Sequence, residues 1–328
     1  MTTIMVTGVG AIIGYGVLRC LRSANPEIRR VGADIHADAV GQIWCDAFEQ
    51  APPTQDEAYL PWLTSIAEKH EVSLLIPGIE QDLYRLHDAA ASGSFVACIV
   101  ALNTPSLIEL CRDKWRFYQD LLRSAPETAI PTYDAGGFEE LADKLGLPFL
   151  LKLRRSYASK GQIRVDDREI FERHASRLGA ELIAQPILGR DDEEYTVAVF
   201  GDGNGRVCAC ITLRRRLAAE GATAKAWVSE PPGLRRTVEK LCAHYRPLGP
   251  TNLQFRHDED CWKLLEINPR ISSSTSIRAA FGYNEAAMCV GFYLRGELPG
   301  QPEIRQGFAH RYIEDHIVLA DQNSSRTT

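Results

Sequence analysis

Short apolar runs alternate with helical periods along the first hundred residues. The pattern predicts a strand, a glycine-rich turn and a helix over residues 2–24, and a second strand that ends at Asp34. A further strand runs into a turn at Pro77-Gly78, and another covers residues 94–102. Strands that alternate with helices favour a parallel sheet. We therefore expect an α/β domain over this part of the chain.

Residues 104–125 have the apolar period of a single helix. Thr104 is expected to be its N-cap and Pro105 to lie in its first turn. Lys114 falls inside the apolar stripe, which is an unusual place for a charge. The proline-containing segment 126–133 then interrupts the pattern and indicates a domain boundary.

From Phe138 onward the pattern is that of an α+β fold, with hairpins and separate helices. The overall prediction is therefore an α/β part followed by an α+β part. Helices are expected at 138–146, 168–179, 234–245 and, as one helix or a pair, 276–296; strands at 147–153 and 181–188; hairpins at 194–216 and 251–270. The first hairpin turns at 202–205, where the sequence reads Asp-Gly-Asn-Gly.

The last hairpin ends in a row of polar residues at alternate positions. Glu266, Asn268 and Arg270 face one side of an otherwise apolar strand, which Pro269 ends. With the turn at residues 257–260, Gln254 on the partner strand approaches Glu266 and Asn268. These side chains offer oxygen ligands, which suit Mg²⁺, and the guanidinium can hold a phosphate oxygen.

Other segments offer weaker signals of the same kind. Lys152 interrupts an apolar strand, and a loop of small residues with Ser159 and Gly161 follows it. The strand that reaches Gln185 can present backbone groups and an amide to a purine. The acidic run 191–193 is interpreted as a solvated surface loop.

Composition limits the classes of partner. The chain has 328 residues with a net charge of −6, so nucleic acid is not expected as its main partner. Nine cysteines without a CxxC pair indicate reduced thiols in a cytoplasmic protein. The N-terminus reads directly into a glycine turn and predicts neither a signal peptide nor a membrane span.

The segment from 249 to 286, with Gln254, Glu266, Asn268, then Pro-Arg and a serine run, closely resembles the ATP-grasp domain of the carbamoyl-phosphate-synthase-like family. The resemblance extends over most of the chain. It implies a Rossmann-like pre-ATP-grasp domain at 1–103, followed by a two-lobed ATP-grasp domain. The linking helix and small lobe would cover 104–188, the large lobe 189–318, and a polar tail 319–328.

The resemblance also implies roles for individual residues. Metal ligands would be Gln254, Glu266 and Asn268. ATP would be held by Lys114, Lys152, Ser159, Gly161, Gln185, the backbone of Ile187 and, at the ribose, Glu194. Arg270 would bind a phosphate, and Arg214 or Arg216 with Lys225 would hold the acyl phosphate or the substrate carboxylate. The loop at 153–161 has fewer glycines than many family members have.

The activity implied is that of an ATP-dependent ligase that forms a C–N bond from a carboxylate and an amine through an acyl phosphate. ATP and Mg²⁺, with Mn²⁺ as a substitute, would be required. Small molecules would be the partners, without nucleic acid or membrane, and a homodimer is common among such proteins. A non-catalytic Mg-ATP-binding protein on the same fold is the first alternative.

A nucleotide-dependent oxidoreductase is the second alternative, because of the glycines at 8, 10, 14 and 16. The dinucleotide fingerprint would need glycine at Ile13, although Asp34 fits it. No lysine has a tyrosine four positions before it, so the Tyr-x-x-x-Lys pair is absent. Carbamoyl phosphate synthesis itself is set aside, because the chain has one grasp half and no catalytic cysteine motif; bicarbonate stays open as the acid.

Overall fold

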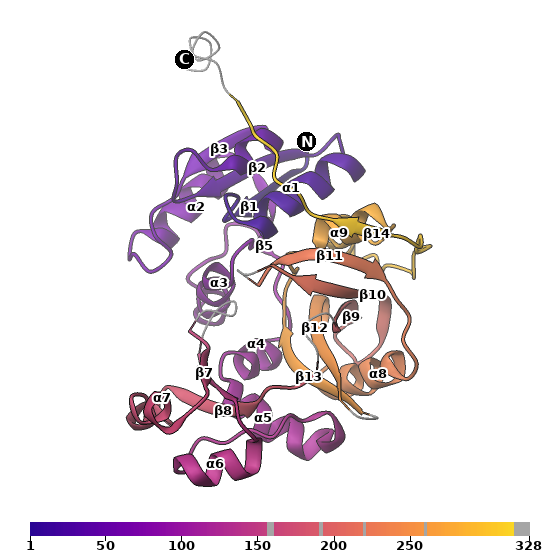
Figure 1. The fold of residues 1–328 in the computed structure, drawn as a ribbon. Helices are drawn as coiled ribbons and strands as arrows, with labels where there is room; N and C mark the ends of the chain where they lie inside the picture. The colour runs from indigo at the N-terminus through magenta and orange to yellow at the C-terminus, as the bar shows by residue number, and fades with distance from the viewer. Residues whose placement is uncertain (156–160, 190–192, 219–220, 259–260, 318–328) are drawn as a thin grey trace.

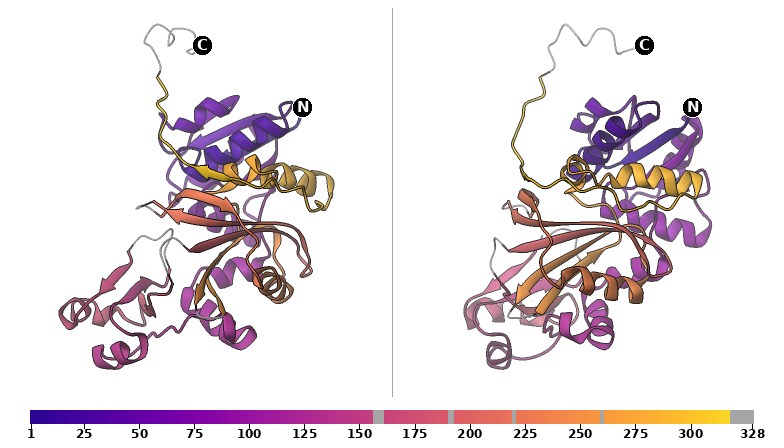
Figure 2. Two further views of the ribbon diagram at one scale, coloured as in Figure 1. Left: turned by 45° about the vertical axis from the view of Figure 1, so that its right-hand side comes forward. Right: turned by 90° about the vertical axis from the view of Figure 1, so that its right-hand side faces the viewer.

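The computed structural model describes residues 1–155, 161–189, 193–218, 221–258 and 261–317. Its strands form three sheets of five, six and three strands. Figures 1 and 2 show the five-stranded sheet at one end of the molecule, the three-stranded sheet at the other, and the six-stranded sheet between them. The predicted combination of an α/β part and an α+β part is confirmed.

The first sheet is parallel and has the order β3-β2-β1-β4-β5. Its strands are β1 (Thr3–Thr7), β2 (Arg29–Asp34), β3 (Ala47–Gln50), β4 (Val72–Ile76) and β5 (Ile99–Val100). Its helices are α1 (Ile12–Ala24), η1 (Val40–Trp44), α2 (Tyr59–Lys69) and α3 (Glu80–Ser92). One face packs against α1 and the other against α2 and α3. The strand expected at 94–102 is reduced to two residues.

The expected helix over 104–125 is two helices, α4 (Pro105–Cys111) and α5 (Lys114–Ser124). The break occurs because Asp113 caps a new helix, accepting hydrogen bonds from the backbone nitrogens of Trp115 and Arg116 at 2.9 and 3.3 Å. Thr104 occupies the N-cap of α4, but its side chain makes no capping bond. The break places Lys114 in the first turn of α5.

The three-stranded antiparallel sheet has the order β7-β6-β8, with β6 (Phe149–Leu153), β7 (Ile163–Val165) and β8 (Leu182–Pro186). It has a small core of its own, built with α6 (Phe138–Leu145) and α7 (Arg168–Glu172). Of two short 3-10 turns, η2 (Pro126–Thr128) precedes this unit in the chain and η3 (Ala175–Arg177) lies between α7 and β8.

The six-stranded antiparallel sheet has the order β13-β12-β9-β10-β11-β14. Its strands are β9 (Glu194–Asp202), β10 (Val207–Leu217), β11 (Thr223–Val228), β12 (Leu248–Asp258), β13 (Cys261–Asn268) and β14 (Phe308–His310). Strands β3, β11 and β14 were not predicted from the sequence.

Alternation along the strands divides this sheet between two cores. Val197 and Val199 pack toward α8 (Leu234–Tyr245), α4 and α5, whereas Ala198 and Phe200 pack toward α1 and the C-terminal helices. Those helices are α9 (Thr275–Ala280), α10 (Glu285–Cys289) and the π-helical turn η4 (Val290–Leu294). Within the described residues, no helix is both long enough and apolar enough to cross a bilayer.

Candidate functional site

A cavity of about 650 Å³ lies where the three sheets approach one another. Among the described residues that line it are six cationic side chains and three carboxylates: Lys114, Lys152, Arg164, Arg215, Arg256 and Arg270, with Glu80, Glu194 and Glu266. The cavity is therefore rich in positive charge although the whole chain has a net charge of −6. Such a site favours an anionic ligand.

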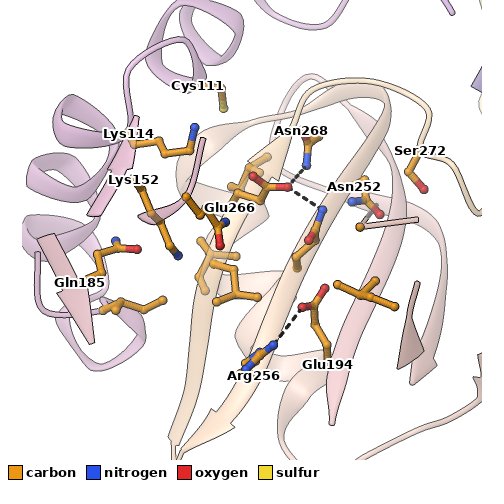
Figure 3. Close-up of a pocket in the computed structure, with 18 of the residues that line it drawn as sticks. Cys111, Lys114, Lys152, Gln185, Glu194, Asn252, Arg256, Glu266, Asn268 and Ser272 are labelled. Atoms are coloured by element: carbon orange, nitrogen blue, oxygen red, sulfur yellow. Dashed lines mark hydrogen bonds and ion pairs between the residues drawn. The ribbon is translucent and has the colours of Figure 1, made fainter. Parts of the chain in front are cut away.

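One wall comes from the last hairpin. Gln254 pairs with Glu266, and Asn252 pairs with Asn268, across β12 and β13. Glu266 Oε1 accepts hydrogen bonds from Gln254 Nε2 at 2.6 Å and from Asn268 Nδ2 at 2.8 Å (Figure 3). The structure thus brings together the three residues that the sequence analysis expected to meet.

The chemistry of this group fits a hard divalent cation. Glu266, Gln254 and Asn268 offer only oxygen ligands, and such cations prefer oxygen. Both amides turn their nitrogens toward Glu266, and Gln254 Oε1 accepts a bond from Arg215 Nη2 at 2.7 Å. Rotation of the amide planes would direct their oxygens to a cation beside the carboxylate.

The opposite wall carries two lysines from different elements. Lys152 lies on β6 and Lys114 at the start of α5, and both line the cavity (Figure 3). Burial, together with the positive charges of Lys114 and Arg256, lowers the pKa of Lys152 to about 8, against the opposing effects of Glu266 and Glu194. The Lys152 ammonium is therefore destabilised by its surroundings and would be stabilised by a bound anion.

Asp113 holds the two lysine-bearing elements together, and the sequence analysis missed it. Its carboxylate accepts bonds from Arg154 Nη2 at 2.8 Å and Nε at 3.2 Å, and the backbone N–H of Lys114 donates to the carbonyl of Arg154 at 3.0 Å. Burial opposes ionisation, but bonds from Arg154 and two backbone N–H groups keep the pKa of Asp113 below its usual value. Its position before a charged, amphipathic helix is an N-cap signal that could have identified it.

The segment after β8 supplies a third side of the cavity. Gln185, Pro186, Ile187 and Leu188 line it, and Gln185 Nε2 donates to Thr132 Oγ1 at 2.8 Å. Arg256 Nη1 donates to the carbonyl of Leu188 at 2.7 Å, which joins this segment to the hairpin wall. An extended segment with an apolar side chain and backbone groups beside a cavity is suited to a planar ring.

Glu194 lies at the base of the cavity in a buried ion-pair network. It accepts bonds from Arg215 Nε at 3.0 Å and Nη2 at 2.5 Å, and its other oxygen is 3.6 Å from Arg256 Nη2. Arg215 in turn reaches Gln254, so the network extends to the hairpin wall. The expected site residue Glu194 therefore lines the cavity, but with both of its oxygens near guanidinium groups.

Arg214, Arg216 and Lys225, which were expected at the substrate site, do not line the cavity. Arg214 pairs with Trp227 and Arg216 with Lys225 across β10 and β11, so the four share one face of the sheet. The guanidinium of Arg214 stacks over the Trp227 ring at 5.1 Å, and neither arginine lines the cavity. Arg215 faces the cavity instead. Strand alternation from the apolar Ile211 and Leu213 could have identified it.

Arg270 also lines the cavity, where an acid of the N-terminal domain holds it. Its Nη2 donates to Glu80 Oε2 at 2.8 Å and to Asn268 Oδ1 at 3.1 Å. Burial opposes its charge, but Glu80 and Glu266 raise the pKa of Arg270 above its usual value. Glu80 begins α3 after the Pro77-Gly78 turn, and nothing in its local sequence marked it as a partner of Arg270.

The two loop residues of the sequence analysis contribute less. Ser159 lies outside the described residues. Gly161 has φ of +78°, and a Cβ there would lie 2.7 Å from a methyl carbon of Leu153, so the turn requires glycine. Gly161 does not line the cavity, whereas the adjacent Gln162 does.

In the glycine turn after β1, the carboxylate of Asp34 binds backbone groups of the protein, whereas the acid of a dinucleotide site binds the ribose. Asp34 Oδ2 accepts a bond from the Gly10 N–H at 2.7 Å, and Oδ1 accepts one from the His36 N–H at 3.0 Å. Its carboxylate thereby fixes the turn. Ile12 and Ile13, just after the turn, line the cavity. The N-terminal domain therefore contributes to the same site.

A family model described as "ATP-grasp in the biosynthetic pathway with Ter operon" matches residues 180–316. The chain is 26% identical over 262 residues to the carbamoyl phosphate synthase large chain of Methanosarcina acetivorans, covering 71% of this chain and 24% of that protein. The Methanosarcina mazei protein of the same name is 25% identical over 260 residues. The chain thus spans about a quarter of the length of these curated relatives.

Solved structures share the fold at low identity. N5-carboxyaminoimidazole synthetase from Staphylococcus aureus, complexed with ADP, has a TM-score of 0.72 and 17% identity, covering 92% of this chain and 80% of its own. Biotin carboxylase from Campylobacter jejuni has a TM-score of 0.70 and 16% identity, with 94% and 74% covered. L-amino acid ligase from Bacillus licheniformis has a TM-score of 0.65 and 14% identity, with 90% and 74% covered.

Proposed function

We propose that this chain carries an ATP-grasp domain and that it is an ATP-dependent ligase that joins a carboxylate to an amine through an acyl phosphate. The observation that carries the proposal is the cavity, in which an oxygen-only group at Glu266 faces two lysines across a strongly cationic space. A polyphosphate with its cation complements both walls. The names of the similar proteins above, which include a biotin carboxylase and an L-amino acid ligase, support the same class of reaction.

ATP would bind with its phosphates between Lys114, Lys152 and the hairpin wall, and with its purine beside Gln185 and Ile187. Glu194 would bind the ribose of ATP. Gln254, Glu266 and Asn268 would hold Mg²⁺, or Mn²⁺ in its place, and the metal when bound would neutralise charge on the phosphates. Lys152 would gain a proton on binding, because phosphate oxygens stabilise its ammonium form.

The carboxylate substrate would be oriented by Arg270 and by Arg215, and Arg215 would take the role first expected of Arg214 or Arg216. A carboxylate oxygen attacks the terminal phosphorus, the bond to the ADP oxygen breaks, and an acyl phosphate forms. The amine nitrogen then attacks the acyl carbon, phosphate leaves, and the nitrogen loses a proton. The cationic side chains lower the barrier by balancing charge on the transferring phosphoryl group.

The test is to trap the acyl phosphate with hydroxylamine. The protein is incubated with Mg-ATP, hydroxylamine and pooled carboxylic acids, with bicarbonate in a separate reaction, while ADP is measured and hydroxamates are identified by mass. A hydroxamate formed in proportion to ADP supports the ligase and identifies its acid. Tight Mg-ATP binding without ADP from any pool, with or without added amines, would instead favour a non-catalytic ATP-binding protein.

A further inference from the structure

Asn252 is a cavity residue that the sequence analysis did not select, although it lies two positions before Gln254 on the same face of β12. Only 1% of Asn252 is exposed. Its Oδ1 accepts bonds from Arg278 Nη2 at 2.6 Å and from Thr196 Oγ1 at 2.6 Å. Figure 3 shows the side chain between the Glu266 group and Ser272.

These two bonds determine which way the amide faces. A guanidinium can only donate, so the atom of Asn252 that meets Arg278 must be the oxygen. The nitrogen is then directed away from Arg278. Among the described residues, Asn252 Nδ2 is a buried donor without a hydrogen-bond partner. An unpaired buried donor costs free energy and calls for an explanation.

Burying the charged guanidinium of Arg278, which holds the amide of Asn252, costs free energy. Arg278 is wholly buried in α9, and its only carboxylate partner among the described residues is Glu285 of α10, at 3.3 Å. A buried ion pair contributes little net stability compared with apolar residues of similar size. Arg278 Nε and Glu285 Oε2 also lack hydrogen-bond partners within the part of the chain that the structure describes, but neither residue lines the cavity. Asn252 is the member of this cluster that faces a ligand space.

We propose that Asn252 is a ligand-binding residue whose amide N–H₂ donates to an anionic oxygen in the cavity, and that Arg278 is the positioning residue that fixes the amide. The identity of the ligand rests on the proposed function. The oxygen belongs either to the terminal phosphate of the nucleotide or to the carboxylate of the acid. Arg215 and Arg270 line the same cavity and make it favourable for negative charge.

The substitution Asn252→Asp tests this donor with little change in shape. Aspartate keeps an oxygen for Arg278 and Thr196, so the buried bonds persist, but it replaces the donor with a negatively charged oxygen. We expect at least a tenfold loss of affinity for the ligand that meets this position, because a charge-assisted bond is exchanged for repulsion. Asn284→Asp is the matched control, since Asn284 caps α10 and does not line the cavity.

The measurements separate the two sources of the oxygen. Calorimetry compares Mg-ATP with Mg-ADP, and inorganic phosphate added to the Mg-ADP complex. The KM of the trapped acid is measured at saturating Mg-ATP. Loss confined to Mg-ATP or phosphate assigns the oxygen to the nucleotide, and loss confined to the acid assigns it to the substrate carboxylate. A folded N252D protein that matches wild type and N284D in all of these measurements overturns the proposal.

The calorimetric measurements do not require turnover. If no acid is found, the proposed reaction fails, yet the donor can still be tested with nucleotide and phosphate. If N252D then bound nucleotide and phosphate with unchanged affinity, the donor role of Asn252 would be overturned as well, because no carboxylate substrate would remain for Asn252 to bind. The two failures are therefore distinguishable.

The role of Arg278 is tested by a double substitution that leaves no buried charge, Arg278→Met with Glu285→Gln. If Arg278 acts through Asn252, the double variant loses affinity for the same ligand as N252D, and adding N252D to it causes no further loss. A purely structural role predicts a lower Tm with unchanged ligand affinity in the folded protein. That result would overturn the positioning role.

Discussion

The two long walls of the cavity carry charge in opposite ways. On the hairpin wall and the adjoining base of the cavity, the charged groups already have partners: Glu266 accepts from two amides, Glu194 faces Arg215 and Arg256, and Arg270 meets Glu80. On the lysine wall burial and like charges depress the pKa of Lys152 to about 8. The side chains of the hairpin wall are thus held in place without a ligand. On the lysine wall, a bound anionic ligand would stabilise the ammonium form of Lys152.

This difference predicts a different role for each of the two walls. A wall of satisfied groups keeps its geometry without a ligand and can position the reacting atoms. The destabilised ammonium of Lys152 contributes affinity, since a bound anion relieves the cost of its burial. Substitutions on the two walls should therefore have different signatures, in turnover on one side and in nucleotide affinity on the other.

The largest effect is expected from Glu266→Gln on the hairpin wall. The amide keeps the shape and some hydrogen bonds but removes the negative charge at the centre of the oxygen group. We expect turnover to fall by about a thousandfold or more, measured as ADP release in the hydroxylamine assay. Exposed Glu239→Gln serves as the control. An E266Q protein with wild-type turnover would rule out the metal assignment.

Asp113→Ala should have the next largest effect, because it disrupts the support of the lysine wall. The change removes a helix cap and leaves Arg154 without its carboxylate partner. We expect a loss of about 2–4 kcal/mol in the free energy of unfolding, measured by urea denaturation, with weaker Mg-ATP binding.

Asp113→Asn provides the comparison for that variant, since it retains the cap but not the charge. It should recover part of the stability. Equal stability of D113A and wild type would contradict the structural role given to this residue.

A smaller effect is expected from pH on Mg-ATP binding. The pKa of Lys152 is lowered from 10.5 to about 8, and phosphate favours the protonated amine. Mg-ATP affinity should therefore fall as pH rises above about 8, by on the order of tenfold near pH 9. Titration calorimetry measures this, and Lys152→Met should flatten the profile.

The same lowered pKa has the opposite consequence for the ligand-free fold. The unfolded chain binds this proton more tightly, so Lys152 destabilises the folded state below pH 8, and the deficit shrinks as pH rises toward 10.5. K152M should remove that rise, whereas Lys144→Met, on an exposed helix position, should not. An identical pH dependence in K152M and wild type would contradict the assignment.

The smallest effect is expected on the outer face of β10. Arg214→Gln should change kcat/KM by less than about threefold, because its guanidinium lies over Trp227 and outside the cavity. Arg215→Lys keeps the charge but loses the fork that meets Glu194 and Gln254, and should lower kcat/KM by about tenfold. A larger loss of kcat/KM in R214Q than in R215K would instead support Arg214 as the substrate-binding arginine.

Short-range spacing was enough to predict one wall of the cavity. Glu266, Asn268 and Arg270 alternate along one strand, so local rules specify the face they share. A register shift between Gln254 and Phe255 then places Gln254 opposite Glu266. The order of strands and helices likewise predicted the parallel sheet. Where the same alternation was not applied, at Arg214 to Arg216, the prediction selected the face that does not line the cavity.

Contacts between residues far apart in the chain were decided only by tertiary packing. Asp113 meets Arg154 across 41 positions and Glu80 meets Arg270 across 190, and neither pairing leaves a local pattern. Arg278 reaches Asn252 because α9 packs beneath the sheet, in a core shared with α1. The sequence by itself determined which side chains a strand presents, because alternation is a local property of the backbone. Only the folded chain decided which charges neutralise one another, because that depends on which surfaces pack together.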